Sequence, residues 1–148
     1  MDEDIDICCI TETWLGPGDQ DSLITSRLTP TGYSGGGIAA VYTSALKVMC
    51  QPVDKFCEFE LMEALVNTGN DCVRLCVVYR TKSSPPAVFM EEFAHYIDAH
   101  TTTTGQLIIV GDFNLHYDSS HNLCARKLSE LLFFLNLHQS MTKAIHWA

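Results

Sequence analysis

The sequence predicts a mixed α/β domain built in layers, and two features of its pattern predict it. Short apolar runs separated by turn-forming residues fill the first part of the chain, as is typical of antiparallel strands. The second part reads strand, helix, strand, helix, and the combination indicates sheets with flanking helices. A length of 148 residues suits one domain or part of a larger one, so we expect a single, incomplete domain over residues 1–148.

The expected strands are short and apolar. Ile5–Ile10 is rich in β-branched residues and predicts a buried strand, and Ile38–Tyr42 follows a run of three glycines. Phe59–Val66 and Cys72–Tyr79 flank a loop of turn formers, which predicts an antiparallel hairpin. Leu107–Val110 is fully apolar and predicts a central strand.

Two helices are expected in the second part of the chain. The first begins at the prolines before Ala87, since proline is tolerated in a first turn. Its apolar stripe consists of Phe89, Phe93 and Ile97. Asn122 can cap the second helix, which runs to about Leu135. Its stripe consists of Leu128, Leu131, Leu132 and Leu135.

Composition excludes several classes of protein. A chain that is 47% hydrophobic is not a disordered acidic tail, and no apolar run approaches the length of a membrane span. The net charge of −9 argues against a simple electrostatic DNA clamp, although seven of the acids precede Arg27. Seven cysteines without a Cys-x-x-Cys pair are expected to be core residues, and together with the lack of a signal peptide they indicate a reducing, intracellular location.

Acidic and amide side chains follow two of the expected strands. Glu12 closes the first strand, while Asp112 and Asn114 follow the strand at 107–110 after a glycine that allows close backbone approach. Oxygen ligands of this kind suit a hard cation such as Mg²⁺. The alternative is that Glu12 and Asp112 only cap the turns that follow, and spacing alone does not decide between the two.

Four motifs occur in one order along the chain. They are Glu12-Thr13-Trp14-Leu15, Gly35-Gly36-Gly37-Ile38-Ala39, Val77-Val78-Tyr79-Arg80 and Gly111-Asp112-Phe113-Asn114. In this order they resemble the endonuclease/exonuclease/phosphatase superfamily, and more narrowly the apurinic-type endonuclease domain of LINE-like, non-LTR retrotransposon polyproteins that also carry a reverse transcriptase. The resemblance implies a partial four-layered α/β sandwich and metal-dependent hydrolysis of phosphate esters, with DNA as the substrate.

The resemblance also implies a role for each motif residue. Glu12 would ligate Mg²⁺ or Mn²⁺, and Asp112 would orient or deprotonate the attacking water. Asn114 would position phosphate and water, and Tyr79 would contact the scissile phosphate. Arg80 is a further candidate phosphate contact, with a salt-bridging surface arginine as the alternative.

Three departures from the family pattern lower the expected activity. No strand with an Asn precedes the Glu12 strand, Ile145 stands where the family has a threonine, and no Ser-Asp-His follows. Gly32-Tyr33-Ser34 also runs into the glycines without the usual basic stretch, so DNA binding should be weak.

Three functions therefore remain open. The first is an impaired Mg²⁺-dependent DNA endonuclease, the second a non-catalytic remnant, and the third a phosphatase acting on phospholipid or inositol phosphate. No membrane partner is expected. Incomplete sheets would invite a completing polypeptide or self-association through their exposed edges.

Overall fold

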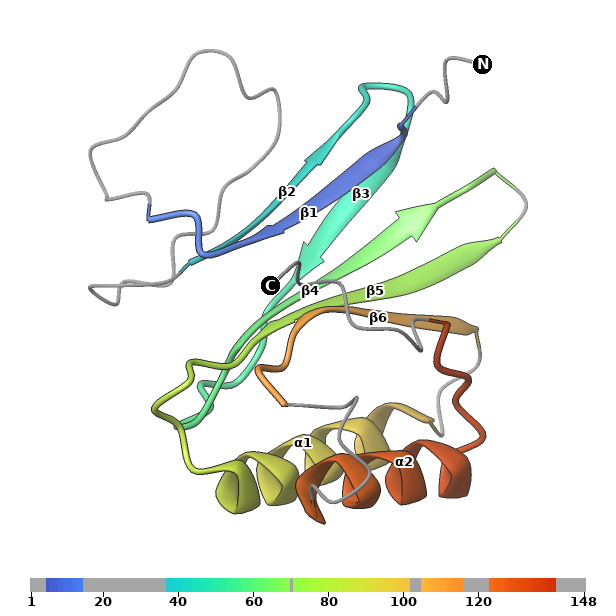
Figure 1. Cartoon of the computed structure of the whole chain (residues 1–148). Coiled ribbons are helices and arrows are strands. Elements are labelled where there is room, and N and C mark those ends of the chain that lie inside the picture. Colours follow the sequence, from blue (N-terminus) through green and yellow to red (C-terminus); the bar gives the residue numbers. More distant parts are fainter. Residues whose placement is uncertain (1–4, 15–36, 70, 102–104, 116–122, 141–148) are drawn as a thin grey trace. The chain divides into compact units, whose positions relative to one another are not determined.

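The computed structural model describes residues 5–14, 37–69, 71–101, 105–115 and 123–140 (Figure 1). Contacts divide the chain into two compact units. The sheet unit comprises Met1–Thr81 and Thr104–Phe113, and the helix unit comprises Lys82–Thr103 and Asn114–Ala148. The sequence-based expectation of one incomplete domain stays a prediction, because compact units are not by themselves separate domains.

All described strands belong to the sheet unit, where they form two sheets. The smaller sheet pairs β1 (Ile7–Thr11) with β2 (Ile38–Tyr42) in antiparallel fashion. The larger sheet has the order β3-β4-β5-β6. Its strands are β3 (Lys47–Gln51), β4 (Glu60–Asn67), β5 (Cys72–Tyr79) and β6 (Gln106–Asp112). Only β6 runs parallel to its neighbour, β5, so the mixed α/β class is confirmed.

One apolar core joins the two sheets of this unit. Alternate residues of each strand point to one face, and the inward faces of β2, β4 and β5 meet. The buried members are Ile38, Ala40, Met62, Val66, Leu75, Val77 and Tyr79. Burying each large side chain contributes about 1.5–3 kcal/mol. The core therefore fixes how the ends of β1 and β5 face each other.

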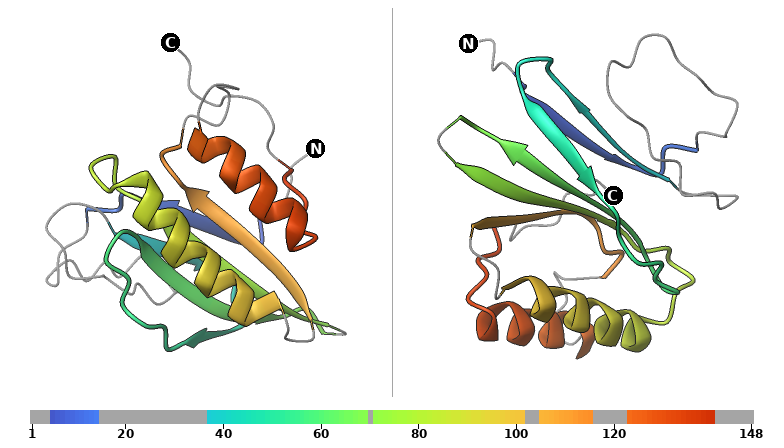
Figure 2. Two further views of the ribbon diagram at one scale, coloured as in Figure 1. Left: turned by 90° about the horizontal axis from the view of Figure 1, so that it is seen from below. Right: turned by 180° about the vertical axis from the view of Figure 1, so that it is seen from behind.

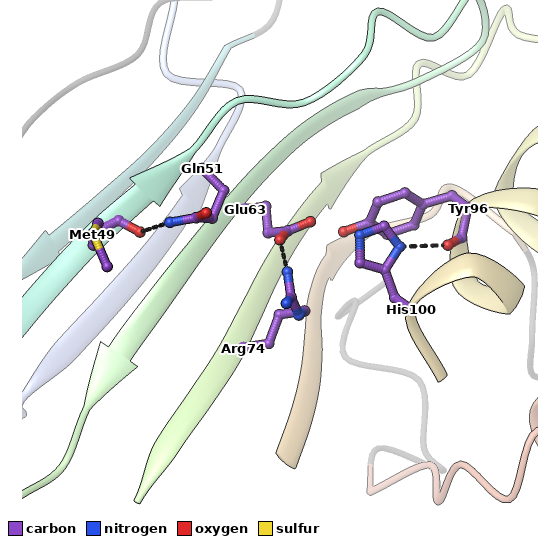
Figure 3. A network of polar contacts seen from close by, with 6 residues as sticks. All are labelled: Met49, Gln51, Glu63, Arg74, Tyr96 and His100. Carbon is purple, nitrogen blue, oxygen red and sulfur yellow. Dashed lines mark hydrogen bonds and ion pairs between the residues drawn. The ribbon is translucent and has the colours of Figure 1, made fainter. Parts of the chain in front are cut away.

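The opposite face of the larger sheet carries a buried ion pair. Glu63 of β4 is 3% exposed, and its carboxylate accepts a hydrogen bond from the Arg74 guanidinium of β5 (Figure 3). The two residues are diagonal neighbours, since Glu63 pairs with Cys76 in the ladder. A buried carboxylate requires such compensation because leaving water is costly for a charge.

Two helices, α1 (Pro86–Thr101) and α2 (Leu123–Phe134), form the described part of the helix unit and lie side by side (Figures 1 and 2). The predicted stripe of α1 is confirmed, because Phe89, Phe93 and Ile97 are buried. In α2 only Leu128 of the predicted leucine stripe is fully buried. Helix α2 ends at Phe134, and in the turn that follows, Asn136 with a φ of 54° lets Leu137 N donate to Leu132 O at 2.8 Å.

Several expectations are corrected by the structure. The first strand is half-buried rather than buried, since β1 presents only one face to the core. The run Leu107–Val110 does form a strand, but β6 lies last in the sheet order of the described residues and Ile108 is 46% exposed. Strand β3 was not predicted from the sequence, because its charged and polar ends hide the alternation.

Expectations about the cysteines are partly wrong. Only Cys76 is buried, whereas Cys8, Cys57 and Cys72 are exposed. All seven cysteines lie in the described part of the chain, and none of them forms a disulfide there. Asn122, the glycines at 35 and 36, and Ile145 lie outside the described residues. Within the described part of the chain, neither helix has the length and apolar character needed to cross a membrane.

The ion pair of the larger sheet yields a stability prediction. Replacing Arg74 by Met keeps the aliphatic stem but removes the charge that compensates the buried Glu63 carboxylate. We expect the free energy of unfolding to fall by about 1–3 kcal/mol. Urea denaturation measures the change. The double variant Glu63→Gln, Arg74→Met should recover part of the loss, and an unchanged urea midpoint in the single variant would contradict the prediction.

Candidate active site

The carboxyl ends of two parallel strands bring two candidate residues together. Tyr79 ends β5 and Asp112 ends β6, and the parallel register pairs the two residues directly. Paired residues of neighbouring strands point to the same face of a sheet. Glu60, the first residue of β4, pairs with Tyr79 from the other side. Tyr79 therefore lies between two carboxylates on the face that also carries the core.

A third carboxylate reaches Tyr79 from the smaller sheet. Glu12 directly follows β1, and the Tyr79 hydroxyl donates a hydrogen bond of 2.9 Å to its Oε1. The tyrosine ring is only 5% exposed and belongs to the core between the sheets. One side chain thus contributes its ring to the core and its hydroxyl to the candidate site.

Burial and charge act on the Tyr79 hydroxyl in the same direction. Burial raises its pKa most, and the hydrogen bond to Glu12 and the charges of Glu12, Asp112 and Glu60 raise it further, to about 12. The phenol therefore stays protonated at physiological pH. It can donate a hydrogen bond to an oxygen atom but cannot act as a base there.

The backbone is unusual directly beyond both strands. Glu12 has φ 56° and Asn114 has φ 47°, both in the left-handed region. Asparagine tolerates this region, whereas glutamate adopts it at a cost of about 1 kcal/mol. Such conformations cluster at functional sites, where the surrounding structure holds them.

A glycine is required beside the site because the two backbones approach closely. Gly111 has φ 138°, and a Cβ at this position would overlap the carbonyl oxygen of its ladder partner Val78. Glycine is the only residue that can adopt this φ and also lacks the Cβ that would overlap Val78 O. The close approach predicted from the sequence is thereby explained, and it sets the position of Asp112.

Arg80 is buried, so the alternative interpretation of a surface arginine is wrong. It is 2% exposed, its backbone N donates to Asp112 O at 2.9 Å, and its Nη1 donates to Phe113 O at 3.1 Å. The residue therefore ties the chain after β5 to the chain after β6. Its predicted contact with phosphate stays a prediction.

The carboxylates of the candidate site are ligands of the kind that a hard divalent cation such as Mg²⁺ prefers. Glu12 and Asp112 each supply a carboxylate beside Tyr79, and Mg²⁺ needs only one or two carboxylates when water and substrate complete its shell. Among the residues that the structure describes, no cluster of three His, Cys, Asp or Glu side chains forms a ready-made metal cage.

The structure brings together Glu12, Tyr79 and Asp112 within the sheet unit, whereas Asn114 belongs to the helix unit. Sequence reasoning missed Glu60. The signal was available, because the predicted hairpin places the start of one strand opposite the end of the other, and so Glu60 opposite Tyr79.

One comparison with known proteins identifies the family, and another identifies a similar fold. The model of the Endonuclease/Exonuclease/phosphatase family matches residues 2–140. Among solved structures, the chain is similar to the endonuclease domain of TRAS1, a telomere-specific non-LTR retrotransposon, with 17% identity and a TM-score of 0.56. The match covers 89% of this chain and 54% of that domain, so the chain spans about half its length. No curated protein matches.

The Tyr79 environment predicts a shifted titration. We expect Tyr79 to ionise near pH 12 rather than near 10, as read from tyrosinate absorbance of the wild type minus that of Tyr79→Phe. Because the folded state raises this pKa, the stability that it contributes is complete below pH 10 and is lost as the pH rises through about 12.

The causes of this shift can be separated by one variant. Glu12→Gln should lower the pKa of Tyr79 but leave it above the ordinary value, because burial is the larger cause. Titration of Tyr79 at the ordinary value in the wild type would contradict this account of the site.

The close approach at Gly111 predicts a position-specific loss of stability. Gly111→Ala must push β6 away from β5, whereas Gly105→Ala meets only Cys72 O at an ordinary 3.5 Å while sharing a positive φ, 129°. Both variants carry the left-handed strain, so Gly111→Ala should cost about 1–3 kcal/mol more. Urea denaturation compares them, and equal losses would show that the backbones do not approach as described.

Proposed function

This chain belongs to the Endonuclease/Exonuclease/phosphatase family, and on that premise we propose that its residues carry the metal-binding and water-orienting part of a DNA endonuclease site. The ancestor is a LINE-like, non-LTR retrotransposon polyprotein, which the likeness to the TRAS1 domain supports in fold. The reaction is hydrolysis of a phosphodiester with Mg²⁺ or Mn²⁺. The single observation that carries the proposal is the convergence of Glu12, Tyr79 and Asp112 at one strand edge.

Glu12 is the proposed metal ligand. Its carboxylate accepts a hydrogen bond through Oε1 from a neutral phenol, which orients the group without neutralising its charge. When bound, a divalent cation would offset negative charge on the phosphate and favour ionisation of water. The nearby Glu60 is a further oxygen donor on the same face of the sheet.

Asp112 is the proposed partner of the attacking water. Its backbone is fixed from two sides, by the ladder to Tyr79 and by the hydrogen bond from Arg80 N. A carboxylate held in this way can accept a proton or a hydrogen bond from water in one direction. Asn114 follows two residues later and would hold the phosphate with its amide.

Tyr79 and Arg80 have different parts in this proposal. The Tyr79 hydroxyl remains protonated and can transfer its hydrogen bond from Glu12 to a phosphate oxygen. Arg80 is a positioning residue, because its guanidinium bonds the backbone of Phe113 and so supports the segment that carries Asp112 and Asn114.

A second candidate function is a domain without catalytic activity. The observation that favours it is the charge of the site, where Glu12, Glu60 and Asp112 surround Tyr79 and the neighbouring Arg80 is buried against backbone. Like charges repel, so these acids oppose the approach of a phosphate ester unless a cation lies between them.

A reducing, intracellular location is proposed, because exposed cysteines without a disulfide, such as Cys8, Cys57 and Cys72, would be prone to oxidation outside the cell. DNA is the proposed partner.

Nicking of supercoiled plasmid tests the proposed reaction. We expect slow nicking that requires Mg²⁺ or Mn²⁺ and falls at least tenfold in Asp112→Asn, because the water loses its carboxylate. Asp54→Asn is the matched control, since Asp54 is an exposed acid outside the site. Equal nicking by wild type and Asp112→Asn would place the activity elsewhere.

No nicking by a folded wild type would instead support the non-catalytic candidate. A panel that includes phospholipid and inositol phosphates would separate the endonuclease from a phosphatase, whose activity should depend on Asp112 in the same way.

A further inference from the structure

An exposed tryptophan stands beside the candidate active site. Trp14 is 69% exposed and lies two residues after Glu12. Tryptophan is normally among the more buried residues, because its large ring gains much from leaving water. Neither the core of the sheet unit nor the proposed hydrolysis uses this ring.

The backbone that carries Trp14 is anchored on both preceding residues. Glu12 accepts the hydrogen bond from Tyr79, and Thr13 N donates to Gly37 O at 3.3 Å. Thr13 Oγ1 also occupies the space that a Cβ of Gly37 would need, which holds these two segments in close contact. The exposed ring is therefore displayed from a fixed segment rather than from a free terminus.

The conformation of Trp14 itself is costly. Its φ of 53° lies in the left-handed region, which costs a bulky residue about 1–2 kcal/mol. With an exposed ring, packing of Trp14 offsets little of this cost, so the anchored neighbours must hold it. Residues held in this way next to an active site support a functional role for the displayed side chain.

The negative charge near Trp14 indicates which part of a nucleic acid could bind there. Glu12, two residues before Trp14, and the acids Glu60 and Asp112 that act with it on Tyr79 offer a nucleic-acid backbone no attraction without a cation. An uncharged aromatic face can instead hold a nucleobase by stacking, whatever the base. A base inside a duplex is already stacked on its neighbours, so the ring would take an unpaired one.

We propose that Trp14 is a stacking platform for an unpaired nucleobase next to the phosphate that a metal ion at Glu12 would hold. The proposal rests on the proposed function, because it takes the ligand to be DNA. It adds a binding site that prefers single-stranded or locally opened DNA over intact duplex. Stacking would also supply affinity that the acidic site does not.

Tryptophan fluorescence tests this site directly. Trp147→Phe leaves Trp14 as the only tryptophan, and Asp112→Asn added to it suppresses cleavage during the titration. With Mg²⁺ present, a short oligothymidylate should quench Trp14, and a fully paired duplex of the same length should quench it less. Free N-acetyltryptophanamide corrects for absorption by the DNA.

Affinity of Trp14 variants provides the second measurement. Fluorescence anisotropy of labelled oligothymidylate should show binding weakened about 5- to 150-fold in Trp14→Ala, which corresponds to about 1–3 kcal/mol. Trp14→Phe should retain most of the affinity because it keeps a stacking face. Phe133→Ala removes an even more exposed ring from α2 and should bind like the wild type.

The outcomes separate the two proposals. Quenching and the loss in Trp14→Ala support the platform even when no plasmid nicking is found, in which case only the proposed reaction fails. Asp112-dependent nicking together with unchanged affinity in a folded Trp14→Ala overturns the platform and leaves the reaction standing. Absence of quenching by oligothymidylate in the single-tryptophan protein also overturns it.

Discussion

The hydrogen bond between Tyr79 and Glu12 is the interaction on which the rest of the sheet unit depends. The ring of Tyr79 belongs to the core between the two sheets, and its hydroxyl reaches the carboxylate that follows β1. A buried hydroxyl needs a partner, because burying it without one costs about 1–3 kcal/mol. The hydrogen bond therefore gives the buried Tyr79 hydroxyl its partner and also fixes the position of the proposed metal ligand Glu12. A change that breaks it would alter both the stability of the sheet unit and the geometry of the proposed site.

Positioning of Asp112 depends on two further contacts. Gly111 lets β6 approach Val78 closely, and Arg80 bonds the backbone of Asp112 and Phe113. Parallel pairing alone would place the strand ends at one edge, but these contacts set the distance and direction of the chain beyond them. The neutral phenol between three carboxylates is a consequence of this arrangement.

The sequence predicted the features that depend on the order of apolar and turn-forming residues within a short stretch of chain. Strand β2 and the hairpin of β4 and β5 follow from apolar runs between turn formers, and the buried stripe of α1 follows from its helical period. The order of strands in a sheet depends on pairing between distant segments and cannot be read from one apolar run. The run in β6 therefore predicted a central strand, although β6 is last in the described sheet. Glu60 and the burial of Arg80 depend on pairing between strands, and the left-handed φ of Trp14 depends on contacts of its neighbours.

The separation of Glu12 and Tyr79 by 67 residues has a consequence for the order of folding. The β4–β5 hairpin closes a short loop and can form early, whereas the sheet-to-sheet contact must await a much larger loop closure. During synthesis Glu12 emerges long before its partner, and Asp112 emerges later still. The edge that carries the proposed site is thus the last part of the sheet unit to assemble, and a chain that stalls as a hairpin would retain secondary structure without the convergence of Glu12, Tyr79 and Asp112.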